Sequence, residues 1–261
     1  MRYYGGKWKI ARWIVKNFPK HRTYVEPYGG GASVLLRKTR SYAEIYNDLD
    51  DDIVTVFRVL RDEKKGKMLH YLLHNTPFAR VEWEESYEET ADEIEKARRV
   101  IIRSFMGYGS DSIHRKSGLR VDSNRSGAPP ARGWMHHSEH VEKFVERLRG
   151  VVIEQRPATD VIKQYDNIET LIYADPPYHT RKGKERYRHK MTEEEHIELA
   201  MVLRKIEGMA VVSGYRSDLY DELYRDWRRE DAPPTRNGAN GKTQECIWLS
   251  RNIPPNQEGF F

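Results

Sequence analysis

The sequence predicts an α/β protein, with a doubly wound sheet interrupted by a mainly helical insert. Strand and helix patterns alternate at both ends of the chain, which is typical of a largely parallel sheet covered by helices. Between these parts, residues 63–106 carry only helical periodicity. Residues 107–135 then show no periodicity and abundant Gly, Ser, Arg and Pro. We therefore predict one sheet domain, residues 1–62 and 150–261, with residues 63–149 as its insert.

The first part of the chain predicts one helix followed by two strand–turn–helix segments. Apolar residues at helical spacing in KWKIARWIVKNF indicate a helix that Pro19 ends. The stretch TYVEPYGGGASVLLRK then predicts a strand, a glycine turn and a helix. In YAEIYNDLDDDIVTVFRVLRD, a short strand and an acidic turn precede a helix from about Leu49.

The rest of the chain supplies the insert and the second half of the sheet. We expect two or three helices within residues 63–106 and another from about His137 to Leu148. Strands are predicted at VVIEQ, TLIYADPPY, MAVVSGY and TQECIWLS, with helices at ATDVIKQY, MTEEEHIELAMVLRKI and SDLYDELYRDW. Thr192 and Glu195 form a capping-box pattern at the start of the second of these helices.

The composition indicates a folded protein with segregated charge. Hydrophobic residues make up 38% of the chain and charged residues 33%, and the formal net charge is +5. Basic residues concentrate in residues 98–133 and 181–190, whereas residues 82–95 are acidic. Segregated basic segments suit a polyanion, and an ordinary solvated surface explains the charge equally well.

Several classes of protein are disfavoured by the sequence. No stretch approaches the roughly 18 consecutive apolar residues of a membrane span, and the N-terminus has no apolar signal segment. The single cysteine, Cys246, excludes a disulfide framework and is expected to be a buried strand residue. His189 and His196 belong to no acid–histidine cluster with ligand spacing, so no metal is predicted. A protein of a reducing compartment is the expectation.

Polar groups gather at three predicted strand ends, where open α/β sheets bind ligands. In Glu26–Ser33, EPYGGGAS, the glycines Gly29, Gly30 and Gly31 allow a tight turn and a close backbone approach to a ligand. This stretch matches neither the dinucleotide fingerprint nor a P-loop, and a structural turn explains it as well as a cofactor turn.

The other two strand ends carry acids. Asp48 follows the second strand about 20 residues after the glycine turn, where doubly wound folds place an acid on ribose hydroxyls. Asp175 ends the strand LIYA, and Pro176 and Pro177 fix the backbone after it. With the flat ring of Tyr178, these residues suit a planar group that bears an NH₂, such as adenine. Ser213 to Tyr215, at the end of VVSGY, lie at a further strand end and are expected to line the same pocket.

Together these motifs resemble the Dam-type (D12 class) DNA adenine N6-methyltransferases of bacteria and phages, which use S-adenosylmethionine. DPPY (Asp175–Tyr178), EPYGGGAS and Asp48 match the family's catalytic motif, glycine motif and acid. YYGGK (Tyr3–Lys7) matches its N-terminal Gly-Gly-Lys motif. The motif order is that of the group whose target-recognition domain lies between the cofactor and catalytic motifs. The resemblance implies a Rossmann-like methyltransferase sheet with residues 63–149 as that domain.

The resemblance also implies roles for single residues. Asp175 and the Pro176 carbonyl bind the adenine N6 amino group, and Tyr178 stacks on the flipped-out base. The cofactor site implied by the resemblance comprises Tyr3, Lys7, Glu26, Pro27, Tyr28, Gly29, Gly31, Asp48 and Asp175. Three positions depart from the family: Tyr28 replaces Phe, Tyr3 stands where many members have Trp, and Gln155–Pro157 lack an Asp that holds the cofactor adenine.

The expected function is site-specific transfer of a methyl group from S-adenosylmethionine to adenine N6 in duplex DNA, with S-adenosylhomocysteine as product and no metal. The expected partner is double-stranded DNA, bound by a monomer or weak dimer in a bacterial cytoplasm or phage-infected cell. Candidate DNA contacts, chosen because Arg, Lys and Asn suit phosphates and base edges, are Arg115, Lys116, Arg120, Asn124, Arg125 and Arg132. Tyr187 is a further candidate, because it lies in the basic segment that follows DPPY. The alternatives are methyl transfer to cytosine N4, RNA or a protein glutamine, and a non-catalytic DNA-binding relative.

Overall fold

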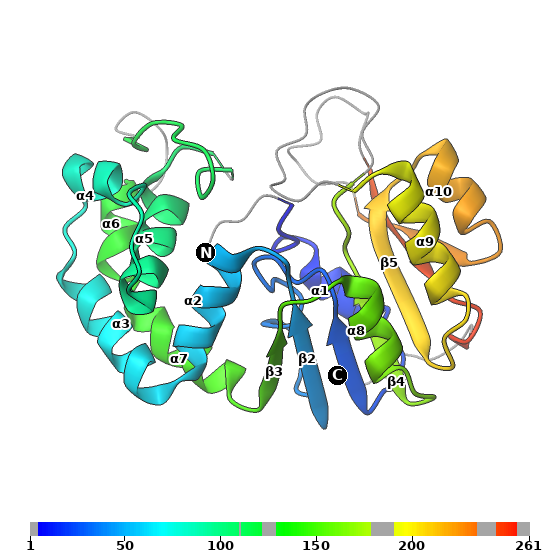
Figure 1. Cartoon of the computed structure of the whole chain (residues 1–261). Helices are drawn as coiled ribbons and strands as arrows, with labels where there is room; N and C mark the ends of the chain where they lie inside the picture. The colour runs from blue at the N-terminus through cyan, green and yellow to red at the C-terminus, as the bar shows by residue number, and fades with distance from the viewer. Residues whose placement is uncertain (1–4, 110, 122–128, 179–190, 234–243, 255–261) are drawn as a thin grey trace. The chain divides into compact units, whose positions relative to one another are not determined.

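A computed structural model of the chain describes residues 5–109, 111–121, 129–178, 191–233 and 244–254 (Figure 1). These residues divide into two compact units. One unit, here called the sheet unit, comprises residues 7–49 and the described residues from 154 onward. The other, here called the helical unit, comprises residues 5–6 and the described part of 50–153.

The sheet confirms the predicted α/β class. In chain order its strands are β1 (Thr23–Glu26), β2 (Ala43–Asn47), β3 (Val151–Glu154), β4 (Thr170–Ala174), β5 (Met209–Tyr215), β6 (Arg228–Asp231) and β7 (Glu245–Leu249). In the sheet the order is β3-β2-β1-β4-β5-β7-β6. β1 is parallel to β2 and β4, and β4 is parallel to β5, whereas β7 runs antiparallel to β5 and β6. The charged strand β6, RRED, was not predicted.

The strand order reverses at β1, which lies between β2 and β4. Val25 of β1 pairs with Ile172 of β4, so the two strands end side by side. Glu26, the last residue of β1, and Asp175, the first residue after β4, therefore occupy the same edge of the sheet. This reversal point is where open α/β sheets bind ligands.

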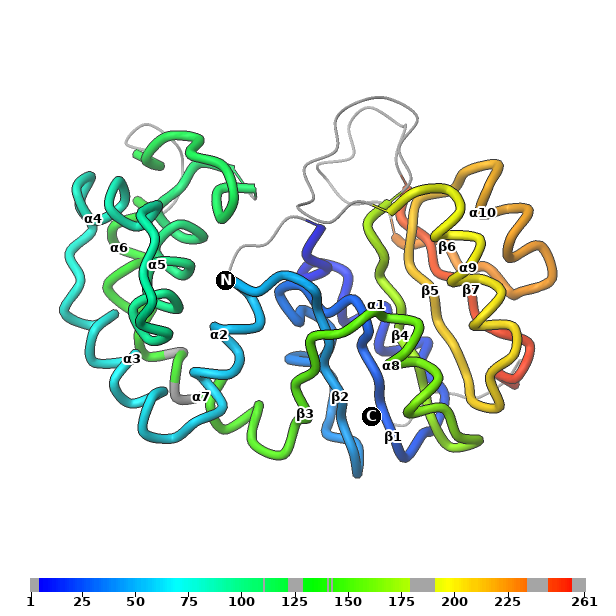
Figure 2. Tube along the Cα trace, in the orientation of Figure 1, coloured from blue at the N-terminus to red at the C-terminus, as the bar shows by residue number. Residues whose placement is uncertain are grey.

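Four helices accompany the strands of the sheet unit: α1 (Ala11–Lys16), α8 (Ala158–Tyr165), α9 (Glu193–Leu203) and α10 (Asp218–Leu223). Figure 2 shows their path along the chain. The capping box is confirmed, because Thr192 accepts from the Glu195 backbone N–H while the Glu195 side chain accepts from that of Thr192. Buried residues of β1, β4 and β5 form the core with apolar side chains from α8 and α9. Cys246 is buried on β7, as predicted.

The helix predicted after the glycine turn is not formed. Residues 31–40 contain only single turns, such as the bond from Leu36 N to Ala32 O (3.0 Å). Ala32 adopts a left-handed conformation (φ 51°), which a right-handed helix cannot include. The buried Lys38 ammonium then bonds Thr39 O and Glu44 Oε1 (2.7 and 2.6 Å) and turns the chain toward β2. The glycine turn is therefore not followed by a helix N-terminus.

The helical unit contains α2 (Asp51–Arg61), α3 (Glu63–Asn75), α4 (Arg80–Glu85), α5 (Glu93–Met106), α6 (Pro130–Met135) and α7 (Glu139–Leu148). Three helices within residues 63–106 agree with the predicted two or three. α6 lies in the stretch predicted to be aperiodic, because six residues are too few to show a helical period. The buried Trp134 fixes α6, since its indole N–H donates to Thr76 O at 2.7 Å.

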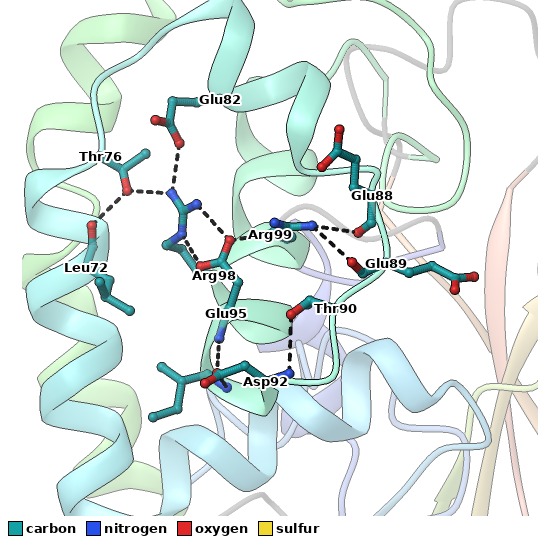
Figure 3. Close-up of polar contacts among 11 residues, drawn as sticks. Leu72, Thr76, Glu82, Glu88, Glu89, Thr90, Asp92, Glu95, Arg98 and Arg99 are labelled. Carbon is teal, nitrogen blue, oxygen red and sulfur yellow. Dashed lines mark hydrogen bonds and ion pairs between the residues drawn. The ribbon is translucent and has the colours of Figure 1, made fainter.

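Arg98 of α5 joins three helices of this unit (Figure 3). Its guanidinium donates to Thr76 Oγ1 at the end of α3 (3.0 Å) and to Glu82 Oε2 of α4 (2.9 Å). It also holds both carboxylate oxygens of Glu95, at 2.7 and 2.8 Å. Arg99 donates to Glu95 Oε1 at 2.7 Å and to the backbone oxygen of Glu88 at 2.9 Å. These charged hydrogen bonds fix α4 against α5, and the bond to Arg98 lowers the pKa of Glu95.

Candidate active site

Asp175 lies at the centre of a polar cluster at the carboxyl end of β4. Its Oδ1 accepts hydrogen bonds from Ser213 Oγ at 2.7 Å and from Lys7 Nζ at 2.9 Å. Ser213 belongs to β5 and lies beside Asp175, because Ala174 pairs with Val212 and these two residues come next on the two strands. Both donors fall on one oxygen, and no donor among the described residues reaches Oδ2. The Asp175 side chain is 17% exposed.

Lys7, which binds this carboxylate, also contacts a pair of tyrosine rings through Tyr178. The buried Lys7 ammonium lies 4.5 Å from the ring centroid of Tyr178, in a cation–π contact. The rings of Tyr178 and Tyr215 meet edge to face, with centroids 4.6 Å apart. The structure thus brings together the predicted residues Lys7, Asp175 and Tyr178, with Ser213 and Tyr215 beside them. The proline pair, Pro176 and Pro177, links the acid to the ring.

The glycine turn is held by residues at the end of β2. A side chain at Gly29 would place its Cβ 2.1 Å from the ring of Tyr46, so only glycine fits. Gly30 (φ 45°) donates its N–H to Asp48 Oδ2 at 2.7 Å, and its carbonyl accepts from the Tyr46 hydroxyl at 2.7 Å. Asp48, which the sequence analysis expected to bind ribose hydroxyls, thus also bonds the glycine turn directly.

Glu26 is buried beneath this turn. Its Oε2 accepts from the Tyr24 hydroxyl at 2.8 Å and from the Leu35 backbone N–H at 3.0 Å. Burial raises the pKa of Glu26 to about 8, the nearby charge of Asp175 raises it further, and the two hydrogen bonds oppose the rise. The carboxyl group is therefore protonated in most molecules near pH 7. The neighbouring residues Pro27 and Tyr28 continue the chain from Glu26 into the turn.

Asn47 is a site residue that the sequence analysis missed. Its amide donates to the carbonyl oxygens of Pro27 and Arg156, at 2.8 and 3.0 Å, and its Oδ1 accepts from the Arg156 N–H at 2.9 Å. It therefore joins the glycine motif to Gln155–Pro157, the segment that departs from the family pattern. The only signal in the sequence is its position next to Asp48.

The predicted DNA contacts that the structure describes all belong to the helical unit. Arg115 and Lys116 are exposed, and Lys116 Nζ lies 5.6 Å from the ring of Trp83. The backbone N–H of Arg120 donates to Met106 O at 2.7 Å. Arg132 lines a pocket of about 360 Å³ with Trp134 and neighbouring apolar side chains. Four predicted site residues lie outside the described residues: Tyr3, Asn124, Arg125 and Tyr187.

The fold also forms an acid–histidine cluster that spacing along the chain does not reveal. Asp50, Asp52 and His114, all of the helical unit, offer ligand atoms within 4.8 Å of one another. Asp50 also caps α2, and Asp52 lies 3.4 Å from Lys96 Nζ and 3.5 Å from Arg103. With these cations beside it, the cluster is an ion-pair network. His196, the other candidate that the structure describes, instead packs on Tyr220; His189 lies outside the described residues.

No helix in the described parts of the chain is long and apolar enough to cross a membrane.

Comparisons with known proteins identify the family to which the chain belongs. The model of the D12 class N6 adenine-specific DNA methyltransferase family matches residues 3–234. The type II methyltransferase M.MjaIII of Methanocaldococcus jannaschii is 21% identical over 86% of this chain and 86% of its own length. The type II methyltransferase M.CviBI of Paramecium bursaria Chlorella virus NC1A is 19% identical over 77% and 76%. The DNA adenine methylase of Escherichia coli K12 is 23% identical over 68% and 64%.

Proposed function

Because the chain belongs to the D12 class of N6 adenine-specific DNA methyltransferases, we propose that Asp175 is the acceptor that binds the adenine amino group. The chain is an adenine-specific DNA methyltransferase of a family that uses S-adenosylmethionine. The observation that carries the proposal is the orientation of Asp175. Lys7 and Ser213 both hold Oδ1, which leaves Oδ2 for the substrate.

The chemistry explains why a fixed acceptor is needed at this point. The lone pair of adenine N6 is delocalised into the ring, so the nitrogen is a weak nucleophile. Hydrogen bonds from its N–H groups to Asp175 Oδ2 and the Pro176 carbonyl draw the nitrogen toward tetrahedral geometry. The same acceptors stabilise the positive charge that develops on N6, and such preorganised groups contribute a few kcal/mol each. The proton leaves N6 after the transfer, so Asp175 does not have to act as a base beforehand.

The glycine turn and its supports suit the methyl donor. The bound sulfonium supplies an activated methyl group, which needs neither a metal nor a covalent enzyme intermediate. In our proposal Asp48 accepts hydrogen bonds from the ribose hydroxyls. The backbone from Glu26 to Gly31 borders the methionine part, and Gly29 allows this turn to pack directly on the ring of Tyr46. Lys7 lies at the same end of the site as Asp175, so the donor and the amino group would meet at this sheet edge.

Tyr178 is proposed to stack on the target base after that base has left the duplex. Lys7 lies over the ring and Tyr215 contacts it from the side, so the ring is held in a fixed orientation. An aromatic face replaces part of the stacking energy that the base loses on flipping. The helical unit, with its exposed Arg115 and Lys116, is proposed to contact DNA as the target-recognition domain.

Replacing Asp175 with Ala tests this proposal. We expect methyl transfer to duplex DNA to fall by at least about 100-fold, because the amino group loses its charged acceptor. DNA affinity and its salt dependence should stay unchanged, because phosphate contacts made elsewhere determine them. Radiolabelled methyl transfer and fluorescence anisotropy measure the two quantities.

The matched control is Asp160→Ala, which removes an exposed acid from the first turn of α8. This variant should keep wild-type methyl transfer within about twofold, as surface substitutions usually do. Wild-type activity of Asp175→Ala would show that the acceptor has been assigned to the wrong residue.

A further inference from the structure

Glu245 is an acid of the active-site cluster that no motif of the sequence identifies. It is the first residue of β7 and pairs with Tyr215 of β5, whose ring contacts Tyr178. Glu245 Oε2 lies 4.0 Å from Lys7 Nζ. The Lys7 ammonium therefore has two carboxylates near it, Asp175 at 2.9 Å and Glu245 at 4.0 Å.

The position of Glu245 is unfavourable for the fold alone. Its Oε2 is buried and accepts no hydrogen bond from the described residues. Burial raises the pKa of Glu245, the Asp175 charge adds to the rise, and Lys7 opposes it. The Glu245 side chain is 27% exposed, but its buried oxygen without a hydrogen bond costs free energy that a neutral side chain in the same place avoids. Such a group points to a role in the chemistry next to it.

We propose that Glu245 is a positioning residue for methyl transfer, which shares the Lys7 ammonium with Asp175 and so keeps Asp175 a strong acceptor. This inference rests on the proposed role of Asp175. If the Lys7 ammonium paired with Asp175 alone, its positive charge would offset most of the negative charge that faces the substrate. Glu245 shares the Lys7 charge, so Asp175 keeps more of its negative charge for the substrate. With Glu245 ionised, the three groups carry a net charge of −1, which offsets the positive charge that develops on N6.

A pH profile can distinguish this role from simple structural support. Asp175 has charged or titratable neighbours on four segments: Lys7 before α1, Glu26 on β1, Tyr173 on β4 and Glu245 on β7. Burial raises the pKa of Glu245 itself, so the ionisation of Glu245 contributes to the acid limb of the wild-type kcat profile. Replacing Glu245 with Gln removes this contribution. The acid limb of the kcat profile should then move to lower pH.

The test compares Glu245→Gln with Glu245→Asp in single-turnover methyl transfer to duplex DNA. For Glu245→Gln we expect a rate about tenfold below wild type, because the loss of one oriented charge slows the chemical step by at least that factor. The KM values for DNA and for S-adenosylmethionine should stay within about twofold. Glu245→Asp keeps the charge and should restore most of the rate. The control Glu230→Gln removes a carboxylate from the neighbouring strand β6 and should change none of these values.

Two results would overturn the role of Glu245. One is a wild-type rate and pH profile for Glu245→Gln. The other is an equal loss of rate in Glu245→Gln and Glu245→Asp with an unmoved acid limb, which would show structural support only. The rate of the wild-type enzyme on DNA tests the proposed function, and the ratio of variant to wild type tests Glu245, so the two failures are distinguishable.

Discussion

At the scale of single residues, burial beneath the glycine turn changes the proton equilibrium of Glu26. Its pKa is about 8, raised from 4.5 by burial. Between pH 4.5 and 8, Glu26 therefore keeps its proton in the folded chain but has lost it in the unfolded chain. The free energy of unfolding falls with rising pH wherever the unfolded state binds fewer protons than the folded state. Glu26 thus makes the fold less stable as the pH rises from about 4.5 to 8.

Glu26→Gln should remove this dependence. The amide oxygen can still accept from Tyr24 and Leu35, but it does not titrate. The free energy of unfolding of the wild type should fall relative to that of the variant by up to about 1.4 kcal/mol per pH unit between pH 5.5 and 7.5. Urea denaturation at pH 5.5, 6.5 and 7.5 measures the difference. Parallel pH curves for the two proteins would contradict the buried, protonated state of Glu26.

Sequence motifs identified the site residues that belong to short patterns, and they missed residues that hold other residues in place. Lys7, Asp175 and Tyr178 stand in short motifs, and the structure places them in contact. Asn47 and Glu245 were missed, because their roles come from strand pairing and from packing against distant parts of the chain. A single Asn or Glu in a strand carries no signal of the partner that the fold will bring beside it.

At the scale of helices and strands, periodicity located most elements, and local packing decided the exceptions. β6 has only four residues and a charged sequence, so no alternation marked it as a strand. The stretch after the glycine turn forms single turns instead of the expected helix, and the left-handed backbone of Ala32 is not visible in the residue type. α2 begins at Asp51, with Asp50 as its N-cap, close to the start predicted near Leu49.

The hydrogen bonds of Arg98 in Figure 3 should contribute to the free energy of unfolding. Arg98→Ala removes charged hydrogen bonds to Thr76, Glu82 and Glu95. It leaves the partly buried Glu82 without its cation and Glu95 with Arg99 alone. We expect the free energy of unfolding to fall by about 2 to 3 kcal/mol. Chemical denaturation followed by circular dichroism measures this change.

The control for Arg98 is Lys67→Ala, which breaks an exposed ion pair with Glu63 one helical turn away. Both side chains of that pair are more than 70% exposed, so its loss should cost at most about 0.5 kcal/mol. Equal effects of the two substitutions would show that the Arg98 network adds no more than a surface pair.

At the scale of the whole molecule, the alternation of strands and helices predicted the α/β class but not the strand order. The reversal at β1 and the antiparallel β7 arise from crossovers between distant segments, which periodicity does not encode. These two features nevertheless build the site. The reversal places Glu26 near Asp175, and β7 brings Glu245 to Lys7. The division into a catalytic domain and a target-recognition domain stays a prediction, and in the structure α2 goes with the helical unit.

The most direct test of the central claim is to identify the nucleoside that the wild-type protein modifies. Duplex DNA of mixed sequence is incubated with the protein and S-adenosylmethionine labelled in the methyl group, beside RNA and protein acceptors. The DNA is then digested to nucleosides and separated. We predict label in N6-methyladenine alone, and none with Asp175→Ala. Label in N4-methylcytosine, in RNA or in protein, or no N6-methyladenine in duplex DNA, would contradict the account.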